Sequence, residues 1–178
     1  MTRRHVTRWL LVVALAAMLA VLSGCGLEGN TLAREGATVF AVGDCVAIPS
    51  GTSTTPATLK AAKVSCGADP SYTVGATTNS AGICPSNEYQ HLPTQFADPS
   101  TSRLCLVPNL VADHCYVLDM PIGMMQLADC AQRKQAGLLV QVTQRLDVRD
   151  QQACPSNPGE YAWPYPSPPR TYCTLTIF

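Results

Sequence analysis

Nine cysteines in a chain of 178 residues are the feature that most constrains this fold. Zinc sites and redox motifs favour close pairs of cysteines, but here even the nearest two, Cys105 and Cys115, have nine residues between them. We therefore expect structural disulfides, with no metal site, no redox-active pair and no cofactor. An odd number leaves one cysteine without a partner, and that cysteine needs a separate explanation.

The N-terminus supplies this explanation. Three arginines precede an apolar run from Trp9 to Leu22, which at about 14 residues is shorter than the roughly 20 that cross a bilayer as a helix. Basic, apolar and then small residues are the order of a secretory signal. The run ends in Leu22-Ser23-Gly24-Cys25, which resembles the bacterial lipobox, whose cysteine receives a diacylglyceryl group. The resemblance implies a lipoprotein signal peptide over 1–24 and lipid attachment at Cys25. The alternative is an ordinary signal peptide, or an uncleaved anchor, in which Cys25 stands by chance.

Assigning Cys25 to lipid leaves an even number of cysteines, as disulfides require. Cytosolic proteins rarely carry so many paired thiols, so both arguments place the chain outside the cytoplasm. Two acyl chains such as palmitate give durable anchoring, which predicts a location on the outer face of the cell membrane. The eight cysteines expected in four disulfides are Cys45, Cys66, Cys84, Cys105, Cys115, Cys130, Cys154 and Cys173.

Charge and length exclude some partners. Removing the three arginines of the signal leaves nine Lys and Arg against twelve Asp and Glu, a formal net charge of −3. A mildly acidic chain has no electrostatic reason to bind nucleic acid. Residues 25–38 show no hydrophobic periodicity and are expected to form a polar tether. What remains has the size of one domain or of two very small ones.

An internal repeat favours two small units. Cys-Pro-Ser-Asn occurs at 84–87 and again at 154–157, each time at the third cysteine of a set of four and each time before a Glu-Tyr pair. We predict two related modules, 39–110 and 111–178, with disulfides formed inside each module. Three pairings per module stay open.

The expected fold class is α+β, with each module made of antiparallel strands and one short helix and stapled by disulfides. Short β-branched and aromatic runs between Gly, Pro, Ser and Thr stretches indicate strands. The helix is expected after each Cys-Pro-Ser-Asn, because Pro suits a first helical turn and Ser or Asn suits a cap. Residues 126–149 have apolar side chains at helical spacing, but the repeat favours a strand at 138–143.

Several motifs of the first module, together with the lipobox, carry a family resemblance. They are Val42-Gly43-Asp44-Cys45-Val46, Lys63-Val64-Ser65-Cys66, Tyr72-Thr73-Val74, Cys84-Pro85 and Leu104-Cys105-Leu106. Over about residues 39–120 the chain resembles the LppU-type lipoproteins of actinobacteria and, more distantly, the module of septum-formation-type proteins. The second module follows only through its cysteine order, with Asp113-His114-Cys115 replacing Gly-Asp-Cys. The resemblance implies a small extracytoplasmic α+β module and brings no catalytic residues with it.

Candidate chemistry is sparse. The chain has no His-Glu-x-x-His, no Gly-x-Ser-x-Gly and no Gly-rich phosphate loop. His114 follows Asp113, and the two could form a base with an orienting carboxylate. His91 follows Glu88 by three residues and could share a helical face that binds a cation weakly. In both cases we favour ordinary surface polarity, and we predict no catalytic residues.

The segment from Pro158 to Arg170 is the candidate partner contact. It contains Tyr161, Trp163 and Tyr165 among five prolines, a composition typical of stiff, extended chain. Its aromatic rings could stack on a sugar or grip a peptide. The alternative, which we favour, is a covering loop whose aromatics fill gaps in a small core.

The sequence thus predicts a lipid-anchored cell-envelope lipoprotein, held by the membrane, that acts as a non-enzymatic binding or scaffolding module for a protein, glycan or lipid. The alternative is an envelope hydrolase with a site assembled from scattered carboxylates and histidine. A concave pocket with His91 or His114 beside a carboxylate would favour the hydrolase. An exposed Tyr161–Trp163–Tyr165 patch would favour the binding module.

Overall fold

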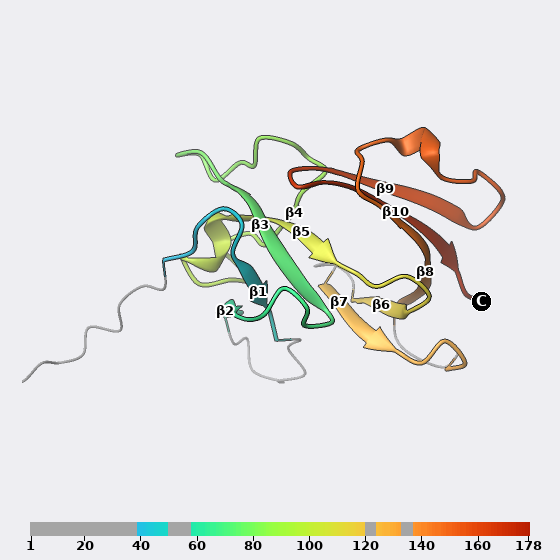
Figure 1. The fold of residues 1–178 in the computed structure, drawn as a ribbon. Coiled ribbons are helices and arrows are strands. Elements are labelled where there is room, and N and C mark those ends of the chain that lie inside the picture. Colours follow the sequence, from blue (N-terminus) through green and yellow to red (C-terminus); the bar gives the residue numbers. More distant parts are fainter. Residues whose placement is uncertain (1–38, 50–57, 120–123, 133–136) are drawn as a thin grey trace, which may run out of the picture. The chain divides into compact units, whose positions relative to one another are not determined.

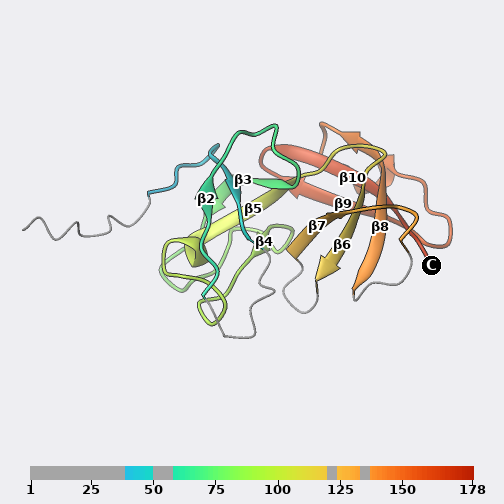
Figure 2. The same ribbon diagram turned by 90° about the horizontal axis from the view of Figure 1, so that it is seen from below.

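The short β-branched and aromatic runs of the sequence form strands. The structure, a computed structural model, describes residues 39–49, 58–119, 124–132 and 137–178. Within these residues the chain forms ten strands, arranged in two five-stranded antiparallel sheets (Figure 1). The strands of each half of the chain form a sheet of their own (Figure 2).

The first sheet has the strand order β2-β1-β3-β5-β4, and the second has the order β7-β6-β8-β10-β9. Strands β6 to β10 therefore occupy, in turn, the positions that β1 to β5 occupy in the first sheet. The first five strands are β1 (Cys45–Ala47), β2 (Ala62–Lys63), β3 (Ser71–Thr77), β4 (Gln90–His91) and β5 (Leu104–Asn109). The second five are β6 (Cys115–Asp119), β7 (Met124–Ala128), β8 (Leu138–Leu146), β9 (Glu160–Pro166) and β10 (Pro169–Thr176).

The turns that lead into β1 and β6 share a hydrogen-bond pattern. Gly43 donates its N–H to Val74 O at 2.8 Å, and Asp113 donates its N–H to Val142 O at 2.7 Å. Val74 and Val142 return a bond to the carbonyl of the residue that follows each turn, at 2.8 and 2.9 Å. Gly43 and Asp113 both have positive φ, 95° and 68°, a region that Gly enters freely and that Asp tolerates better than most residues.

The expectation of an α+β fold is wrong. The helical elements of the described residues are two short 3-10 turns, η1 (Thr101–Arg103) and η2 (Gln151–Ala153), and no α-helix follows either Cys-Pro-Ser-Asn. After the second motif, Glu160 N–H donates to Asn157 O at 3.0 Å, which closes a turn around Pro158 and Gly159. Gly159 has a φ of 85°, and Pro followed by Gly at positive φ is the pattern of a type II turn.

After the first Cys-Pro-Ser-Asn, a side chain competes with the helix for the backbone. Ser86 Oγ accepts the N–H of Glu88 at 3.2 Å, and such local bonds offer the chain an alternative to a helical turn. The strand predicted at 138–143 is confirmed, because it lies inside β8. Val140 and Val142 are buried in the core on one face of this strand, and Leu139 is buried on the other, although the upstream spacing suggested a helix.

One buried cluster joins the two sheets. Cys105 and Val107 of β5 pack with Tyr116, Val140 and Tyr172, which come from β6, β8 and β10. Each fully buried side chain of this size contributes roughly 1.5–3 kcal/mol relative to an exposed one. The two halves of the described chain are therefore packed through a common core rather than merely connected by the chain.

Tyrosine hydroxyls add hydrogen bonds across this contact. Tyr172 in β10 donates to Pro108 O in β5 at 2.7 Å. Tyr72 in β3 accepts the N–H of Met125 in β7 at 3.0 Å. Burial raises the pKa of Tyr72 to about 12, an effect that the bond from Met125 only partly offsets. These hydroxyls satisfy backbone groups that would otherwise be buried without a partner.

The expected disulfides are present. They join cysteines in sequence order, as Cys45–Cys66, Cys84–Cys105, Cys115–Cys130 and Cys154–Cys173. Each bond joins two cysteines of the same half of the chain, two bonds in each half, and each closes a loop of 15 to 21 residues. Loops of this length place each bridge at roughly 3 kcal/mol of stabilisation in the chain-entropy model.

The two halves come into close contact at Gly75 in β3. A Cβ at this position would lie 2.0 Å from the carbonyl oxygen of Ser167, in the turn between β9 and β10, and 2.5 Å from the ring of Tyr89. The register between β3 and β5 also shifts between Val74 and Ala76, on either side of this glycine. Glycine is therefore the residue that lets the β9–β10 turn rest on β3.

Strand β9 is an edge of the second sheet. Thr176 N–H donates to Gly159 O at 2.8 Å, so Gly159 turns its backbone groups toward β10. Along an antiparallel pair, residues alternate between turning their backbone groups toward the partner strand and away from it. The residues of β9 that turn theirs away from β10 are therefore Glu160, Ala162, Pro164 and Pro166. Two of these four outward positions are prolines, which have no N–H to offer.

Candidate functional site

A polar hollow lies where the two halves meet near the Cys-Pro-Ser-Asn turns. Its volume is about 690 Å³, and it is open to solvent. Glu88 comes from the first half, and the other lining residues come from the second half, around η2 and β9. They are Arg149, Asp150, Gln151, Gln152, Cys154, Ser156 and Pro164.

A two-pronged ion pair spans this hollow. Arg149 Nε and Nη2 donate to the two carboxylate oxygens of Glu88, each at 2.9 Å. Hydrogen bonding to Glu88, with the attraction of its charge, raises the pKa of Arg149 above its ordinary value. A fork-to-fork geometry fixes orientation as well as distance, so this pair sets the spacing of the hollow's two sides.

Asp150 orders another part of the lining. Its carboxylate accepts the N–H of Gln152 at 2.9 Å, which is the capping contact expected at the start of a helical turn. Its own N–H donates to Thr171 Oγ1 at 3.0 Å, tying η2 to β10. The side chains of Gln151 and Gln152 are exposed, and neither has a hydrogen-bond partner among the residues that the structure describes.

This set of groups can both donate and accept. Each glutamine amide offers two N–H donors and a carbonyl acceptor, and Ser156 adds a hydroxyl. Glu88 and Arg149 offset each other's charge, which leaves Asp150 as the unbalanced carboxylate of the lining. The hollow therefore suits a polar ligand that carries many hydroxyl groups and little negative charge.

A second polar cluster centres on Asp69. His114 donates from Nδ1 to Asp69 Oδ2 at 2.7 Å, and the hydroxyl of Tyr116 donates to Oδ1 at 2.6 Å. Burial, and then the neighbouring carboxylate, raises the pKa of Tyr116 above its ordinary value. Asp113 is the carboxylate beside His114 in the sequence, but the carboxylate that contacts His114 lies 45 residues earlier in the chain. Sequence spacing gave no signal for this contact.

His91 has a structural contact. It lies in β4, and its Nε2 donates to the carbonyl of Ser102 at 2.9 Å. The helical face that was expected to carry Glu88 and His91 does not exist. No histidine lines the polar hollow, and none lines the apolar hollow described below.

The three aromatic residues of β9 lie at very different depths. Tyr161 is 57% exposed, Trp163 is half-buried, and Tyr165 is only 3% exposed. Trp163 packs against the shared core, and the ring of Tyr165 meets that of Tyr172 edge to face. Burial raises the pKa of Tyr165 above its ordinary value. Of the predicted contact residues, Tyr161 is thus the one with a largely free ring.

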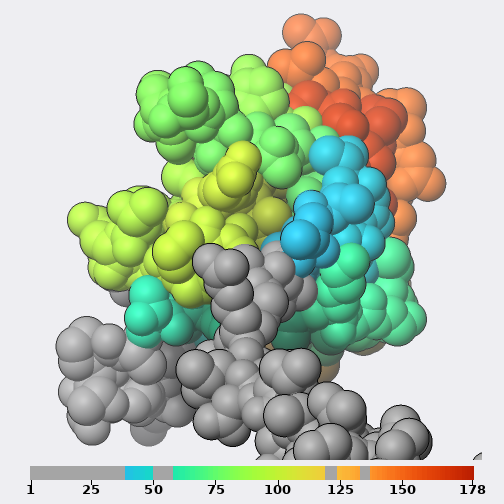
Figure 3. All heavy atoms as spheres, turned by 90° about the vertical axis from the view of Figure 1, so that its left-hand side faces the viewer, coloured from blue at the N-terminus to red at the C-terminus, as the bar shows by residue number. Residues whose placement is uncertain are grey.

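A second, mainly apolar hollow of about 410 Å³ lies on the first sheet. It is lined by Val39, Phe40, Thr77, Pro99, Ser100, Arg103 and Leu104. Figure 3 shows this face, where the blue residues near 40 lie beside the yellow-green residues near 100.

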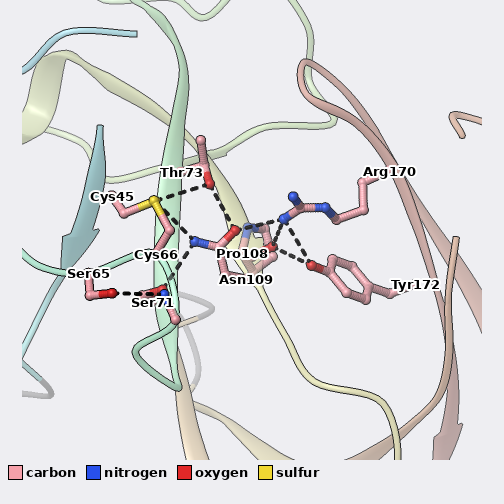
Figure 4. Close-up of a disulfide and its surroundings, with 10 residues drawn as sticks. Cys45, Ser65, Cys66, Ser71, Thr73, Pro108, Asn109, Arg170 and Tyr172 are labelled. Atoms are coloured by element: carbon pink, nitrogen blue, oxygen red, sulfur yellow. Dashed lines mark hydrogen bonds between the residues drawn. A yellow bond between two sulfur atoms is a disulfide. The ribbon is translucent and has the colours of Figure 1, made fainter. Parts of the chain in front are cut away.

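A buried polar network that the sequence gave no reason to expect lies beside the Cys45–Cys66 disulfide (Figure 4). Asn109 Nδ2 donates to Ser71 Oγ at 3.1 Å and to Cys45 Sγ at 3.7 Å. Its Oδ1 accepts from Thr73 Oγ1 at 2.8 Å and from Arg170 Nη1 at 2.7 Å. Arg170 is 8% exposed, and the sequence marked it only as the end of a Pro-rich segment.

Several predicted features lie outside the described residues, namely the signal peptide 1–24, lipid attachment at Cys25 and the tether 25–38. In the ranges that the structure does describe, no helix is long and apolar enough to cross a membrane. No group of three or more His, Cys, Asp or Glu side chains in those ranges is placed to hold a metal ion.

Comparisons with known proteins find no relative. No protein-family model matches the chain, and searches of curated proteins and of solved structures find no match.

Proposed function

We propose that this chain is a lipid-anchored, extracytoplasmic binding module without catalytic activity, and that its polar hollow contacts a hydroxyl-rich envelope glycan. The lipobox-like tetrapeptide that ends at Cys25 supports the anchor. Four disulfides support an oxidising compartment. The resemblance to LppU-type lipoproteins supports the same location.

The hollow at Glu88–Arg149 carries the glycan part of this proposal. Pockets that recognise ligands are concave surfaces with a few fixed polar groups, and here the Glu88–Arg149 pair and the Asp150 cap hold those groups in place. Exposed amides at Gln151 and Gln152 can bond sugar hydroxyls in either direction. Tyr161 and Trp163 lie on the opposite face of β9 from Pro164, so we assign ring stacking no part in this contact.

The test is co-sedimentation of the full lipidated chain, in detergent, with cell-wall glycan freed of protein. Replacing both Gln151 and Gln152 with Ala should weaken binding about thirtyfold, since each of the two lost hydrogen bonds is worth about 1 kcal/mol and 1.4 kcal/mol is a factor of ten. The matched control is Gln144→Ala, which removes an exposed amide from β8, outside the lining of the hollow. Failure of the unaltered protein to sediment, or an equal loss in the control, would contradict the proposal.

We further propose that the two halves descend from one duplicated module, 39–110 and 111–178. The shared strand order and the matching bonds at Gly43 and Asp113 support this origin. An experimental structure in which β1–β5 and β6–β10 cannot be superposed in order would count against it.

The second candidate is an envelope hydrolase with His114 as its general base, and the 2.7 Å bond from His114 to Asp69 is the observation that favours it. Its test is the release of new reducing ends from the same glycan. A hydrolase predicts release by the unaltered chain and none by His114→Gln. The binding module predicts no release by either.

A further inference from the structure

The Cys45–Cys66 disulfide differs from the others in how its two sulfurs are placed. Cys45 is 4% exposed, whereas Cys66 lies in an exposed loop after β2. In the other three pairs, both cysteines are buried or half-buried. An attacking thiolate needs access to one sulfur, and the other sulfur then leaves as a thiolate. Cys66 offers that access, and Cys45 is the group that would leave.

The surroundings of Cys45 suit a leaving thiolate. Asn109 Nδ2 donates toward its sulfur at 3.7 Å, and Thr73 Oγ1 lies 3.6 Å from it (Figure 4). Donors aimed at a sulfur stabilise its anion and lower the barrier to its departure. Thr73 now donates to Asn109 Oδ1, and a rotation about its C–O bond would turn the same proton to the sulfur.

A buried cation strengthens this arrangement. Arg170 Nη1 bonds Asn109 Oδ1 at 2.7 Å, and among the described ion pairs no carboxylate faces Arg170. Its Nε is also buried without a hydrogen-bond partner. A guanidinium on the carbonyl side of an amide polarises the N–H on the other side, which here points at Cys45. A negative charge on the Cys45 sulfur would therefore lie near the buried positive charge of Arg170, which has no carboxylate partner among the described ion pairs.

The corresponding bridge in the second half lacks these features. Cys115 is 1% exposed, and it packs in an apolar cluster with Val117 and Leu139. Cys130 is half-buried against the same cluster, and no hydrogen bond from a residue that the structure describes reaches either sulfur. Cys115–Cys130 is therefore an internal reference with the same place in its sheet and a different environment.

We propose that Cys45–Cys66 is a thiol-exchange site for an extracytoplasmic dithiol oxidoreductase. This inference rests on the proposed extracytoplasmic location of the chain and not on glycan binding. The partner's thiolate attacks Cys66 Sγ, the S–S bond breaks, and Cys45 leaves as a thiolate beside Asn109. The partner's second thiol then attacks the mixed disulfide and releases Cys66. The disulfide gains two electrons, the partner dithiol becomes a disulfide, and solvent supplies the protons for the two released thiols.

Exchange would change the contact between the halves. The disulfide ties β1 to the loop that runs from Cys66 to Asp69, and Asp69 holds His114 and Tyr116 of the second half. Opening the bridge frees this loop at its start. The site therefore links the redox state of one disulfide to a carboxylate that joins the two sheets.

The test is timed reduction of the full chain with dithiothreitol, followed by alkylation and peptide mass spectrometry. Cys45 and Cys66 should be labelled first, at least about tenfold faster than Cys115 and Cys130. Asn109→Asp should slow this step about tenfold, because it removes the N–H, places a negative charge beside the sulfur and still gives Arg170 a partner. The matched control is Asn79→Asp, whose bonds stay within its own loop.

Thr73→Val keeps the shape of the side chain and removes its hydroxyl, so it should also slow the labelling, by a few-fold. This variant serves as the test if Asn109→Asp does not fold. Rates for Cys115–Cys130 should stay the same in every variant. Equal labelling of all four bridges, or unchanged rates in both the Asn109 and Thr73 variants, would overturn the proposal.

Discussion

Replacing Gly75 with Ala tests the contact between the two halves. The new Cβ would lie 2.0 Å from Ser167 O, whereas a carbon and a carbonyl oxygen need about 3.3 Å. The β9–β10 turn must therefore retreat by more than 1 Å, because the obstacle is backbone and cannot rotate away. The retreat would also loosen packing at Tyr89, 2.5 Å from the same Cβ, and at Val107, 3.2 Å away.

Overpacking of this kind costs about 1–3 kcal/mol, and the double obstruction places Gly75→Ala near 3 kcal/mol. For a domain of this size we expect the Tm to fall by about 10 °C. The measurement is thermal unfolding of the oxidised chain followed by circular dichroism. Gly67→Ala is the matched control, since its Cβ would meet only Ser65 Oγ, at 3.7 Å, and it should leave the Tm unchanged or slightly raised. A Tm for Gly75→Ala within about 2 °C of the unaltered protein would refute the contact as described.

Three further predictions follow from single contacts. The pKa of Tyr72 is raised to about 12, so its contribution to stability is full below the unfolded pKa of 10.0 and is lost as the pH rises toward 12. Ultraviolet titration should show one tyrosine hydroxyl that ionises near pH 12, and Tyr72→Phe should remove that step. Glu88→Gln should leave the free energy of unfolding almost unchanged and make it less sensitive to salt, because Arg149 is about half exposed. Chemical denaturation at two salt concentrations measures both, and a steep fall in the free energy of unfolding of the variant would mean that the pair is effectively buried. Cys25→Ala should move the protein from the membrane to the soluble fraction on cell fractionation, and retention by the variant would end the lipid hypothesis.

Some of the fold could be predicted because it depends on counting and local chemistry. Eight cysteines without close pairs predict four bridges, and the structure contains them. Their connectivity needed coordinates, since the sequence left three choices in each half. The strand at 138–143 was predicted only by giving the repeat more weight than the helical spacing.

The predicted helices failed because a cap-like sequence also makes a turn. Pro158 and Gly159 fit a type II turn as well as Pro155 fits a first helical turn, and strand pairing of β9 with β10 decided between them. The strand period of two puts Tyr161, Trp163 and Tyr165 on one face of β9, but the sequence does not show that this face runs from solvent into the core. The contact of His114 with Asp69 depends on how the two sheets pack, and no local pattern encodes it.

The prolines on the outer edge of β9 have a consequence for how many copies can share a surface. Lipid anchoring, as proposed, would confine these molecules to a plane, where encounters between neighbours are frequent. An uninterrupted edge of amides would there seed intermolecular sheets, whereas Pro164 and Pro166 break the ladder that a neighbour would need. The outer edge of β9 thus disfavours pairing with a neighbouring molecule even at high surface density.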